Sequence, residues 1–516
     1  MFMRLMMGLM VLMSGFFAPV AMAEGKAKHV VVIVWDGMRP DFVSEQYSPT
    51  LFKLAREGVW FDNHHPVYVS ATEVNGSAIA TGAYPGHDGV IGNKEYRPEI
   101  DPLKPFHTEE IEPVRKGDEV SHGHYLRVAT VAEILRNKGM RTVIAGAKGV
   151  ALLHDRSERP ANSRGVDLFA GQSLPTNVLA DIIAMYGPFP GTNSPRLTRN
   201  DWTTKAMIDP LWKNGVPEFS LLWMNEPDAS QHATGPGSAK SLAAIKNADD
   251  NLARVLAALD AKGVRDQTDI ILVSDHGFST VLSLVDLAED LTNAGFKAVR
   301  EFKTAPASGD ILVSGNGGSV LLYVTGHDQK VIERLVKFLQ GWSYTGVILT
   351  KQPKAGTFTL AQAHVDSPTA PDVLVSMRWK PERSDNGTLG MLICDLCPYA
   401  PGQGMHGSLS PFDMHNTCVA AGPDFRSGVM DHLSTGNVDI APTVLWILGV
   451  KQPKTMDGRV VTEALVGTES KIKSFEPNHL EVTRNLGNAV WHQYLNFTEV
   501  NGVRYLEEGN GFQTAK

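Results

Sequence analysis

The chain has 516 residues, of which 43% are hydrophobic and 20% are charged, with 48 Gly and 30 Pro. This is the composition of a globular protein, and it excludes the disordered, collagen-like and coiled-coil classes. The formal net charge of −8 at pH 7 gives no reason to expect a nucleic-acid duplex or an anionic membrane surface as partner. The length allows one large domain with insertions, or a domain with a cap.

The first 23 residues have the organisation of a secretory signal peptide. Arg4 precedes an apolar run from Leu5 to Phe17, and Ala21-Met22-Ala23 then places small residues where a signal peptidase cuts. The apolar run is about 13 residues long, short of the ~20 that a membrane-spanning helix needs. We therefore expect a signal peptide over 1–23 and a secreted mature protein without a membrane span, with the periplasm as its compartment.

The three cysteines, Cys394, Cys397 and Cys418, are too few for disulfides to hold the fold together. Cys394-Asp-Leu-Cys397 favours a local disulfide in an oxidising compartment. A redox-active motif would need a thioredoxin-like βαβ context, and a structural zinc site would need four ligands; neither is found around this pair.

Strands that alternate with helices predict the fold class. His29-Val-Val-Val-Ile-Val-Trp-Asp36 is an unbroken apolar run, which is typical of a strand buried on both faces of a parallel sheet. Further strands are predicted at 142–145, 219–224 and 269–275, and helices at 48–58, 130–139, 238–262 and 438–448. This order indicates an α/β fold, a doubly wound, mostly parallel sheet flanked by helices.

The division of the chain follows from this pattern. We expect a catalytic domain over 24–470 that carries cap insertions at about 95–215 and 281–377, followed by a C-terminal extension over 471–516. Asn501-Gly502 predicts a hairpin turn in the extension. The Gly-, Pro- and Cys-rich stretch 382–404 is expected to be a loop near the functional site.

Five separated pieces of the sequence place metal-type ligands in turn or loop context. They are Asp36-Gly37, Thr72 within 70–75, Asp228-Ala-Ser-Gln-His232, Asp275-His276-Gly277 and Met405-His406-Gly407. Three of the acids follow predicted strands, and sites in doubly wound sheets gather at the carboxyl ends of strands. Carboxylates and imidazoles without thiolates suit Zn²⁺, with Mn²⁺ or Fe as lesser options.

Seven ligands are too many for one tetrahedral ion, so they divide into two ions with a hydroxyl between them as nucleophile. Two ions about 4 Å apart can hold the attacking and leaving oxygens of an in-line displacement at phosphorus. Each piece alone has an ordinary explanation as a cap, a turn or a solvated helix face. Their occurrence as an ordered set favours the metal site.

In this order the pieces resemble the alkaline phosphatase superfamily, and specifically its type I phosphodiesterase/nucleotide pyrophosphatase branch. The resemblance extends from about Val30 to Gly449 and rests on six segments. They are Val-Ile-Val-Trp-Asp36-Gly-Met-Arg-Pro, Thr72-Glu-Val-Asn-Gly-Ser-Ala-Ile-Ala-Thr-Gly82, Gly-Val-Ile-Gly-Asn93, Asn-Glu-Pro-Asp228-Ala-Ser-Gln-His232, Ser-Asp275-His276-Gly-Phe and Gly-Met-His406-Gly.

The resemblance implies roles for these residues. Two Zn²⁺ per chain are expected, the first bound by Asp228 and His232, the second by Asp36 and by the Asp275-His276 pair. The last histidine ligand comes from the segment around His406. Two more residues carry the chemistry: Thr72 is the implied nucleophile and metal ligand, and Asn93 is implied to hold the transferred phosphoryl oxygen.

The predicted function is that of a secreted two-zinc phosphodiesterase or nucleotide pyrophosphatase that acts on a small-molecule phosphate ester through a phosphothreonine. The alternative is a phosphonate or phosphomonoester hydrolase on the same site. A sulfatase is less expected, because sulfatases use a Cys or Ser that is converted to formylglycine, and Thr72 is neither. A non-catalytic binding protein would be expected to have lost a ligand or the nucleophile, and this chain has lost none of them. Family members that act on nucleotides usually have an aromatic residue after the nucleophile, where this chain has Glu73; Lys148 could reach an anionic group of the substrate.

Overall fold

The computed structural model describes residues 25–160, 162–191, 194–468, 472 and 474–516. The predicted signal peptide lies outside the described residues. Among the helices that are described, none is both long and apolar enough to cross a membrane.

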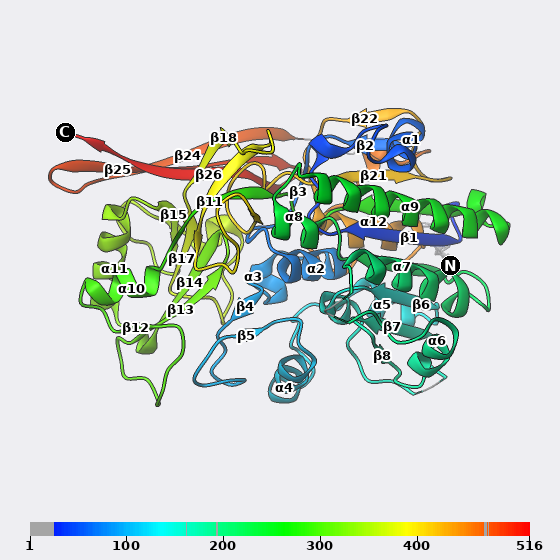
Figure 1. Ribbon diagram of the computed structural model, residues 1–516, viewed down its shortest axis with the longest axis horizontal. Coiled ribbons are helices and arrows are strands. Elements are labelled where there is room, and N and C mark those ends of the chain that lie inside the picture. The colour runs from blue at the N-terminus through cyan, green and yellow to red at the C-terminus, as the bar shows by residue number, and fades with distance from the viewer. Residues whose placement is uncertain (1–24, 161, 192–193, 469–471, 473) are drawn as a thin grey trace, which may run out of the picture.

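A nine-stranded, mostly parallel sheet forms the centre of the molecule (Figure 1). Its strand order is β22-β2-β21-β10-β1-β9-β6-β7-β8. The strands are β1 (His29–Trp35), β2 (Val59–Phe61), β6 (Thr142–Gly146), β7 (Gly165–Phe169), β8 (Gln172–Leu174), β9 (Phe219–Met224), β10 (Thr268–Val273), β21 (Cys418–Ala421) and β22 (Val429–Asp431). β1 pairs in parallel with β10 on one side and β9 on the other, which explains its continuous apolar run.

Alternate residues of β1 enter two different cores, because successive side chains of a strand point to opposite faces of the sheet. Val31 and Ile33 pack in one core with helices α1, α7 and α9. Val30 and Val32 pack in the other core with helices α2, α5 and α12. The predicted α/β class, with helices on both faces of the sheet, is confirmed.

The helices have these bounds: α1 (Pro49–Glu57), α2 (Thr72–Thr81), α3 (Pro85–Asp88), α4 (Ile111–Ser121), α5 (Val131–Asn137), α6 (Val178–Tyr186), α7 (Leu197–Ala206), α8 (Asp228–Thr234), α9 (Ala239–Ala261), α10 (Leu287–Asn293), α11 (Gln329–Gly341) and α12 (Ile440–Ile447). The helices predicted at 48–58, 130–139, 238–262 and 438–448 correspond to α1, α5, α9 and α12. Thr130 and Glu133 form the predicted capping box at the start of α5.

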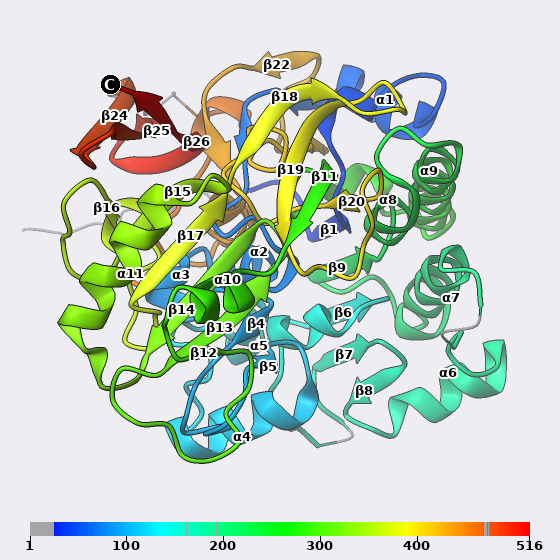
Figure 2. The same cartoon turned by 60° about the vertical axis from the view of Figure 1, so that its left-hand side comes forward.

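Two smaller sheets lie beside the central one (Figure 2). The six-stranded sheet contains β12 (Ala298–Val299), β13 (Ile311–Asn316), β14 (Ser319–Val324), β15 (Thr345–Thr350), β16 (Phe358–Thr359) and β17 (Val373–Met377), and α10 and α11 share its core. The four-stranded sheet contains β11 (Ser279–Val285), β18 (Trp379–Arg383), β19 (Leu389–Asp395) and β20 (Gly404–Met405).

The expectation of a loop throughout 382–404 is wrong for its first part. β19 pairs antiparallel with β18, its neighbour in the sequence, and in parallel with β11, a strand that is distant in the sequence. Residues 396–403 do form a loop, and Cys394 and Cys397 form the predicted local disulfide. The division into a catalytic domain and two cap insertions stays a prediction, with β6, β7 and β8 of the first insertion range placed in the central sheet.

The C-terminal residues form a three-stranded antiparallel sheet of β24 (Phe475–Asn485), β25 (Ala489–Val500) and β26 (Val503–Ala515). The predicted hairpin is confirmed, since Asn501 and Gly502 join β25 to β26 with positive φ angles of 53° and 83°. Trp491 is fully buried and its Nε1 donates to the Gly356 carbonyl at 3.1 Å. This sheet is therefore fastened to the body of the protein by an aromatic anchor. Two further pairs complete the strands: β3 (His64–His65) with β23 (Thr435–Gly436), and β4 (Lys94–Glu95) with β5 (Phe106–His107).

Replacement of this anchor tests the docking of the C-terminal sheet. We expect Trp491→Ala to lower the free energy of unfolding by about 3–5 kcal/mol, because it removes a fully buried indole. The measurement is the urea unfolding midpoint. Phe512→Ala is the matched control, because Phe512 lies on the same sheet but is 43% exposed. Equal midpoints for the two variants would contradict the anchor role.

Candidate active site

Three carboxylates meet at one edge of the central sheet. Asp36 directly follows β1, Asp275 comes two residues after β10, and Asp228 comes four residues after β9. Because β1 lies between β9 and β10 and all three run parallel, their carboxyl ends lie together. The sheet order thus explains why acids far apart in sequence converge.

Two predicted ligand segments are helical and not loops. Asp228 begins α8, and residues four apart on a helix share a face, so the Nε2 of His232 lies 3.1 Å from the Oδ1 of Asp228. Thr72 begins α2. The segments that contain them are short or lack an amphipathic pattern, which is why the sequence did not indicate a helix.

The structure brings all six predicted Asp and His ligands together in two groups. In each group the ligand atoms lie within 4.8 Å of one another, and all six residues are buried. The first group is Asp228, His232 and His406; the second is Asp36, Asp275 and His276. This division agrees with the one that the family resemblance implied.

The three imidazoles share one orientation. Each Nδ1 lies within hydrogen-bond distance of a backbone carbonyl: His232 with Gly404 at 2.9 Å, His406 with Ser70 at 2.9 Å and His276 with Gly277 at 2.8 Å. A carbonyl oxygen can only accept, so each Nδ1 carries the proton. The Nε2 atoms are left bare and face the carboxylates, as in histidines that ligate metals.

The carboxylates have oxygen atoms that nothing in the described chain satisfies. Oδ1 of Asp36, Oδ1 of Asp228 and Oδ2 of Asp275 are buried without a hydrogen-bond partner. The other oxygens are occupied: Oδ2 of Asp36 accepts from Trp223 Nε1 at 2.9 Å, and Oδ1 of Asp275 accepts from the Gly37 amide at 2.9 Å. Because a buried, unsatisfied carboxylate oxygen is costly, these three atoms fit the binding of cations.

The burial and closeness of these acids and histidines also shift their pKa values. Burial, and then the neighbouring Asp36, raise the pKa of Asp275 well above its usual value, and burial raises the pKa of Asp36 to about 6. Burial also opposes ionisation of Asp228, but Lys148 and His232 outweigh it and hold its pKa well below the usual range. Burial lowers the pKa of His276 to about 3, so this imidazole is neutral at pH 7 and available as a ligand.

Thr72 lies at the junction of the two groups. Its Oγ1 is 3.3 Å from the Nε2 of His276 and 3.3 Å from the Nζ of Lys148. The Oδ1 of Asn75 accepts from the Val67 amide at 2.7 Å, which fixes the chain just before the helix. Thr72 as a whole is 1% exposed, so its side chain is held in place by the surrounding residues.

Asn93 lies beside the start of the same helix. Its Oδ1 accepts from the Glu73 amide at 3.1 Å, and its Nδ2 has no hydrogen-bond partner among the described residues. Thr72, Asn93, Lys148, His232 and His406 line one cavity of about 560 Å³. The structure thus places both predicted catalytic residues at the same opening as the first ligand group.

Other neighbours of the site were not indicated by the sequence. Trp223 belongs to a mostly apolar, fully buried strand, where nothing distinguishes it from a core residue, yet it donates to Asp36. Tyr399 stacks on His232 with ring centroids 4.3 Å apart. Lys148 was expected only to reach substrate, but its Nζ lies 2.9 Å from Asp36 and 3.2 Å from Asp228. The position of Lys148 just after a strand indicated a place near the site. No sequence pattern singled out Tyr399 within the stretch 382–404.

A sheet-edge site of buried carboxylates and imidazoles around a hydroxyl defines a class of metal-dependent hydrolase. The chain belongs to the type I phosphodiesterase / nucleotide pyrophosphatase family, whose model matches residues 30–385. This confirms the family that the motifs predicted, a family whose members are phosphodiesterase and pyrophosphatase hydrolases. Members of the family are metal-dependent, in keeping with the two ligand groups.

Curated relatives are distant. Human ectonucleotide pyrophosphatase/phosphodiesterase family member 1 is 24% identical over 245 residues, which are 47% of this chain and 22% of that protein. Bis(5'-adenosyl)-triphosphatase of the mouse is 21% identical over 281 residues, which are 54% of this chain and 53% of that one. The chain therefore spans about half or less of the length of these relatives.

Solved structures share the fold. Murine ectonucleotide pyrophosphatase / phosphodiesterase 5, as an inactive threonine-to-alanine variant in complex with AMP, has a TM-score of 0.58 and 15% identity, and the match covers 85% of this chain and 99% of that one. The human counterpart has a TM-score of 0.56 and the same identity. At this identity the likeness concerns the fold alone.

Metal binding by the two groups is testable on the protein itself. We expect the isolated protein to bind zinc, and Asp275→Asn to lower the zinc content by about one ion per chain, because the second group loses a charged ligand. Removal of metal by a chelator should lower the thermal midpoint, and added zinc should restore it, because a ligand that binds only the folded state stabilises it.

The matched control is Asp41→Asn. Asp41 pairs with Arg39 and its side chain is 54% exposed. Zinc content and the zinc-dependent midpoint shift should stay as in the wild type. If zinc raised the thermal midpoint of Asp275→Asn by as much as that of the wild type, the assignment of Asp275 as a ligand would be contradicted.

Proposed function

We propose that this protein is a secreted two-zinc phosphodiesterase or nucleotide pyrophosphatase that works through a phosphothreonine at Thr72. The supporting observation is the position of the Thr72 hydroxyl between two groups of buried ligands, 3.3 Å from the Nε2 of His276. A hydroxyl in this place can serve as a nucleophile once a cation lowers its pKa.

In this proposal six residues are metal ligands and one residue reacts with the substrate. Asp228, His232 and His406 would hold one zinc ion, and Asp36, Asp275 and His276 the other. When bound, the ions supply Lewis acidity and positive charge for the attacking and leaving oxygens. Thr72 Oγ1 attacks the phosphorus, the bond to the ester oxygen breaks, and the alcohol leaves. Water then attacks the phosphorus of the phosphothreonine, and Thr72 is released.

Hydrogen-bond donors near Thr72 are suited to the negative oxygens of the transferred group. The Thr72 amide, the first of α2, has no partner within the helix. The Glu73 amide donates to the Oδ1 of Asn93, which leaves the amide NH₂ group of Asn93 as a donor at the cavity wall. Such preorganised donors stabilise the charge that develops in a phosphoryl-transfer transition state. Asn93 is thus proposed as a catalytic residue together with Thr72.

The residue beside Thr72 in the cavity wall indicates how a substrate would be recognised. Glu73 follows Thr72, is 4% exposed and lines the cavity, and its Oε2 has no hydrogen-bond partner among the described residues. A carboxyl group does not stack on a base as an aromatic ring does. If the substrate is a nucleotide, its base is therefore recognised elsewhere in the cavity.

The proposed location outside the cytoplasm, in the periplasm, rests on the predicted signal peptide and on the local disulfide. Disulfides form and persist in oxidising compartments. The human relative is named an ectonucleotide pyrophosphatase/phosphodiesterase, which agrees with this proposal.

Thr72→Ala tests the nucleophile. We expect hydrolysis of bis-p-nitrophenyl phosphate to fall at least about 10³-fold, because the attacking atom is lost while the six Asp and His ligands remain. Zinc content should be unchanged. Thr81→Ala is the matched control, and its activity should stay near wild type. Thr81 lies at the far end of the same helix, where its Oγ1 donates to the Ser77 carbonyl and accepts from the Ala83 amide. Activity in Thr72→Ala above a tenth of wild type would rule out the phosphothreonine.

A phosphomonoesterase is the second candidate, and one observation favours it. The ammonium group of Lys148 lies 3.3 Å from the nucleophile and is 22% exposed towards the cavity. A monoester carries one more negative charge on phosphorus than a diester, and a nearby cation stabilises that charge.

Lys148→Ala separates the two candidates. If monoesters are the natural substrates, kcat/KM for p-nitrophenyl phosphate should fall about tenfold more than kcat/KM for the diester. If diesters are, both should fall by a similar factor. Lys53→Ala is the control, because Lys53 lies exposed on α1. Zinc binding without hydrolysis of either ester would direct the search to phosphonates.

A further inference from the structure

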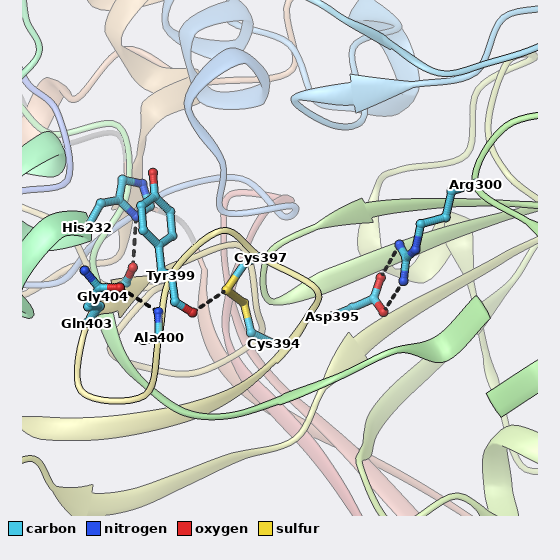
Figure 3. Close-up of a disulfide and its surroundings, with 9 residues drawn as sticks. All are labelled: His232, Arg300, Cys394, Asp395, Cys397, Tyr399, Ala400, Gln403 and Gly404. Atoms are coloured by element: carbon cyan, nitrogen blue, oxygen red, sulfur yellow. Dashed lines mark hydrogen bonds and ion pairs between the residues drawn. A yellow bond between two sulfur atoms is a disulfide. The ribbon is translucent and has the colours of Figure 1, made fainter. Parts of the chain in front are cut away.

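One loop holds the His232 ring from two directions. Residues 394–404, called here the disulfide loop, run from the end of β19 to the start of β20 (Figure 3). Tyr399 of this loop stacks on the face of His232, with ring planes 12° apart and centroids 4.3 Å apart. Gly404 at the end of the loop accepts the Nδ1 proton of His232 at 2.9 Å.

The other two histidine ligands do not depend on this loop in the same way. The rings of His276 and His406 stack on each other with centroids 3.6 Å apart, and each binds a carbonyl outside residues 394–404. His232 meets Phe278 only edge-on, at 4.9 Å. The disulfide loop therefore supplies the stacking face of one ligand in particular.

The two ends of the loop are fixed by polar contacts. Asp395 binds both terminal nitrogens of Arg300, at 3.0 and 2.8 Å, which Figure 3 shows as a bidentate pair. At the other end, Gln403 donates from Nε2 to the Ala233 carbonyl at 2.7 Å and accepts from the Ala400 amide at 2.6 Å. The loop thus spans from the smaller sheets to α8, the helix that carries His232.

Between these ends the disulfide is the covalent constraint. It closes the turn Cys394–Cys397, in which Leu396 has a φ of 39° and is 50% exposed. Tyr399 follows only two residues later. Without the disulfide, this turn would have to hold a strained, exposed residue without covalent support, and the position of Tyr399 would be less fixed.

We propose that the Cys394–Cys397 disulfide and Tyr399 are positioning residues for His232, so that the Asp228–His232–His406 group binds its zinc at full strength only while the disulfide is formed. The inference rests on the proposed two-zinc function and adds a dependence on the oxidation state of the loop. Partners that orient a histidine ligand typically contribute 10–100-fold to metal affinity.

The reduced state can be made chemically. A water-soluble trialkylphosphine breaks the sulfur–sulfur bond and gives two thiols, while the phosphine takes up the oxygen of one water molecule and becomes a phosphine oxide. This reductant is preferable to a dithiol, which would itself bind zinc. The variant Cys394→Ser/Cys397→Ser reproduces the open loop and removes both thiols as competing zinc ligands.

The experiment measures zinc affinity by titration against a chromophoric chelator, with the full-length protein and without substrate. We expect one of two zinc ions to bind about tenfold more weakly in Cys394→Ser/Cys397→Ser, in the phosphine-reduced wild type and in Tyr399→Ala. Tyr399→Phe should bind as the wild type does, because it keeps the ring. The Tyr399 hydroxyl makes no hydrogen bond with the described residues, so the change removes none.

The control for loss of a tyrosine is Tyr344→Ala, because Tyr344 packs edge-on against Trp342 in the turn before β15. Two tight zinc ions in the serine variant and in Tyr399→Ala would overturn the inference and leave the proposed function standing. Equal weakening in Tyr399→Phe and Tyr399→Ala would also overturn it, since stacking would not be the cause. No zinc in the wild type would overturn the proposed function itself. If a variant does not fold, the reduced wild type decides.

Discussion

The burial of three carboxylates at one edge of a parallel sheet is the constraint on which the rest of the site depends. Asp36, Asp228 and Asp275 are each placed there by a neighbouring strand, and each has an oxygen that the described chain leaves unsatisfied. Repulsion between such groups would favour unfolding unless positive charge lies among them. Lys148 supplies part of this charge, and the geometry of the imidazoles is suited to cations that would supply the remainder.

The surrounding chain is arranged to keep this charge in place. Trp223 and the Gly37 amide occupy the carboxylate oxygens that face away from the ligand groups. Backbone carbonyls occupy the Nδ1 atoms of the histidines, which fixes their tautomer as well as their direction. The proposed nucleophile depends on this arrangement. The start of α2 places the Thr72 hydroxyl beside His276 and Lys148, and the proposed cations would lower its pKa.

The sequence predicted the parts of this structure that depend on local patterns. The apolar run before Asp36, the capping box at Thr130 and the turn at Asn501-Gly502 each determine a structure through nearby residues. The site residues could be predicted because acids and histidines follow strands in an order that resembles a known family. What remained hidden depends on long-range pairing. β19 pairs in parallel with β11, a strand from a distant part of the chain, and Tyr399 matters because its loop closes over a histidine 167 positions earlier. No pattern within a short window contains that information.

The ligands of the first group illustrate how the chain order acts on assembly. Asp228 and His232 lie on adjacent turns of the short helix α8, whereas His406 directly follows β20. The sheet itself needs chain that follows His406, because β10, which leads to Asp275, pairs with β21 (Cys418–Ala421). The His276–His406 ring stack likewise joins the end of β10 to the segment after β20. The sheet edge and the proposed first metal group are therefore completed by the same late part of the chain, so a chain that stops before β20 would lack both.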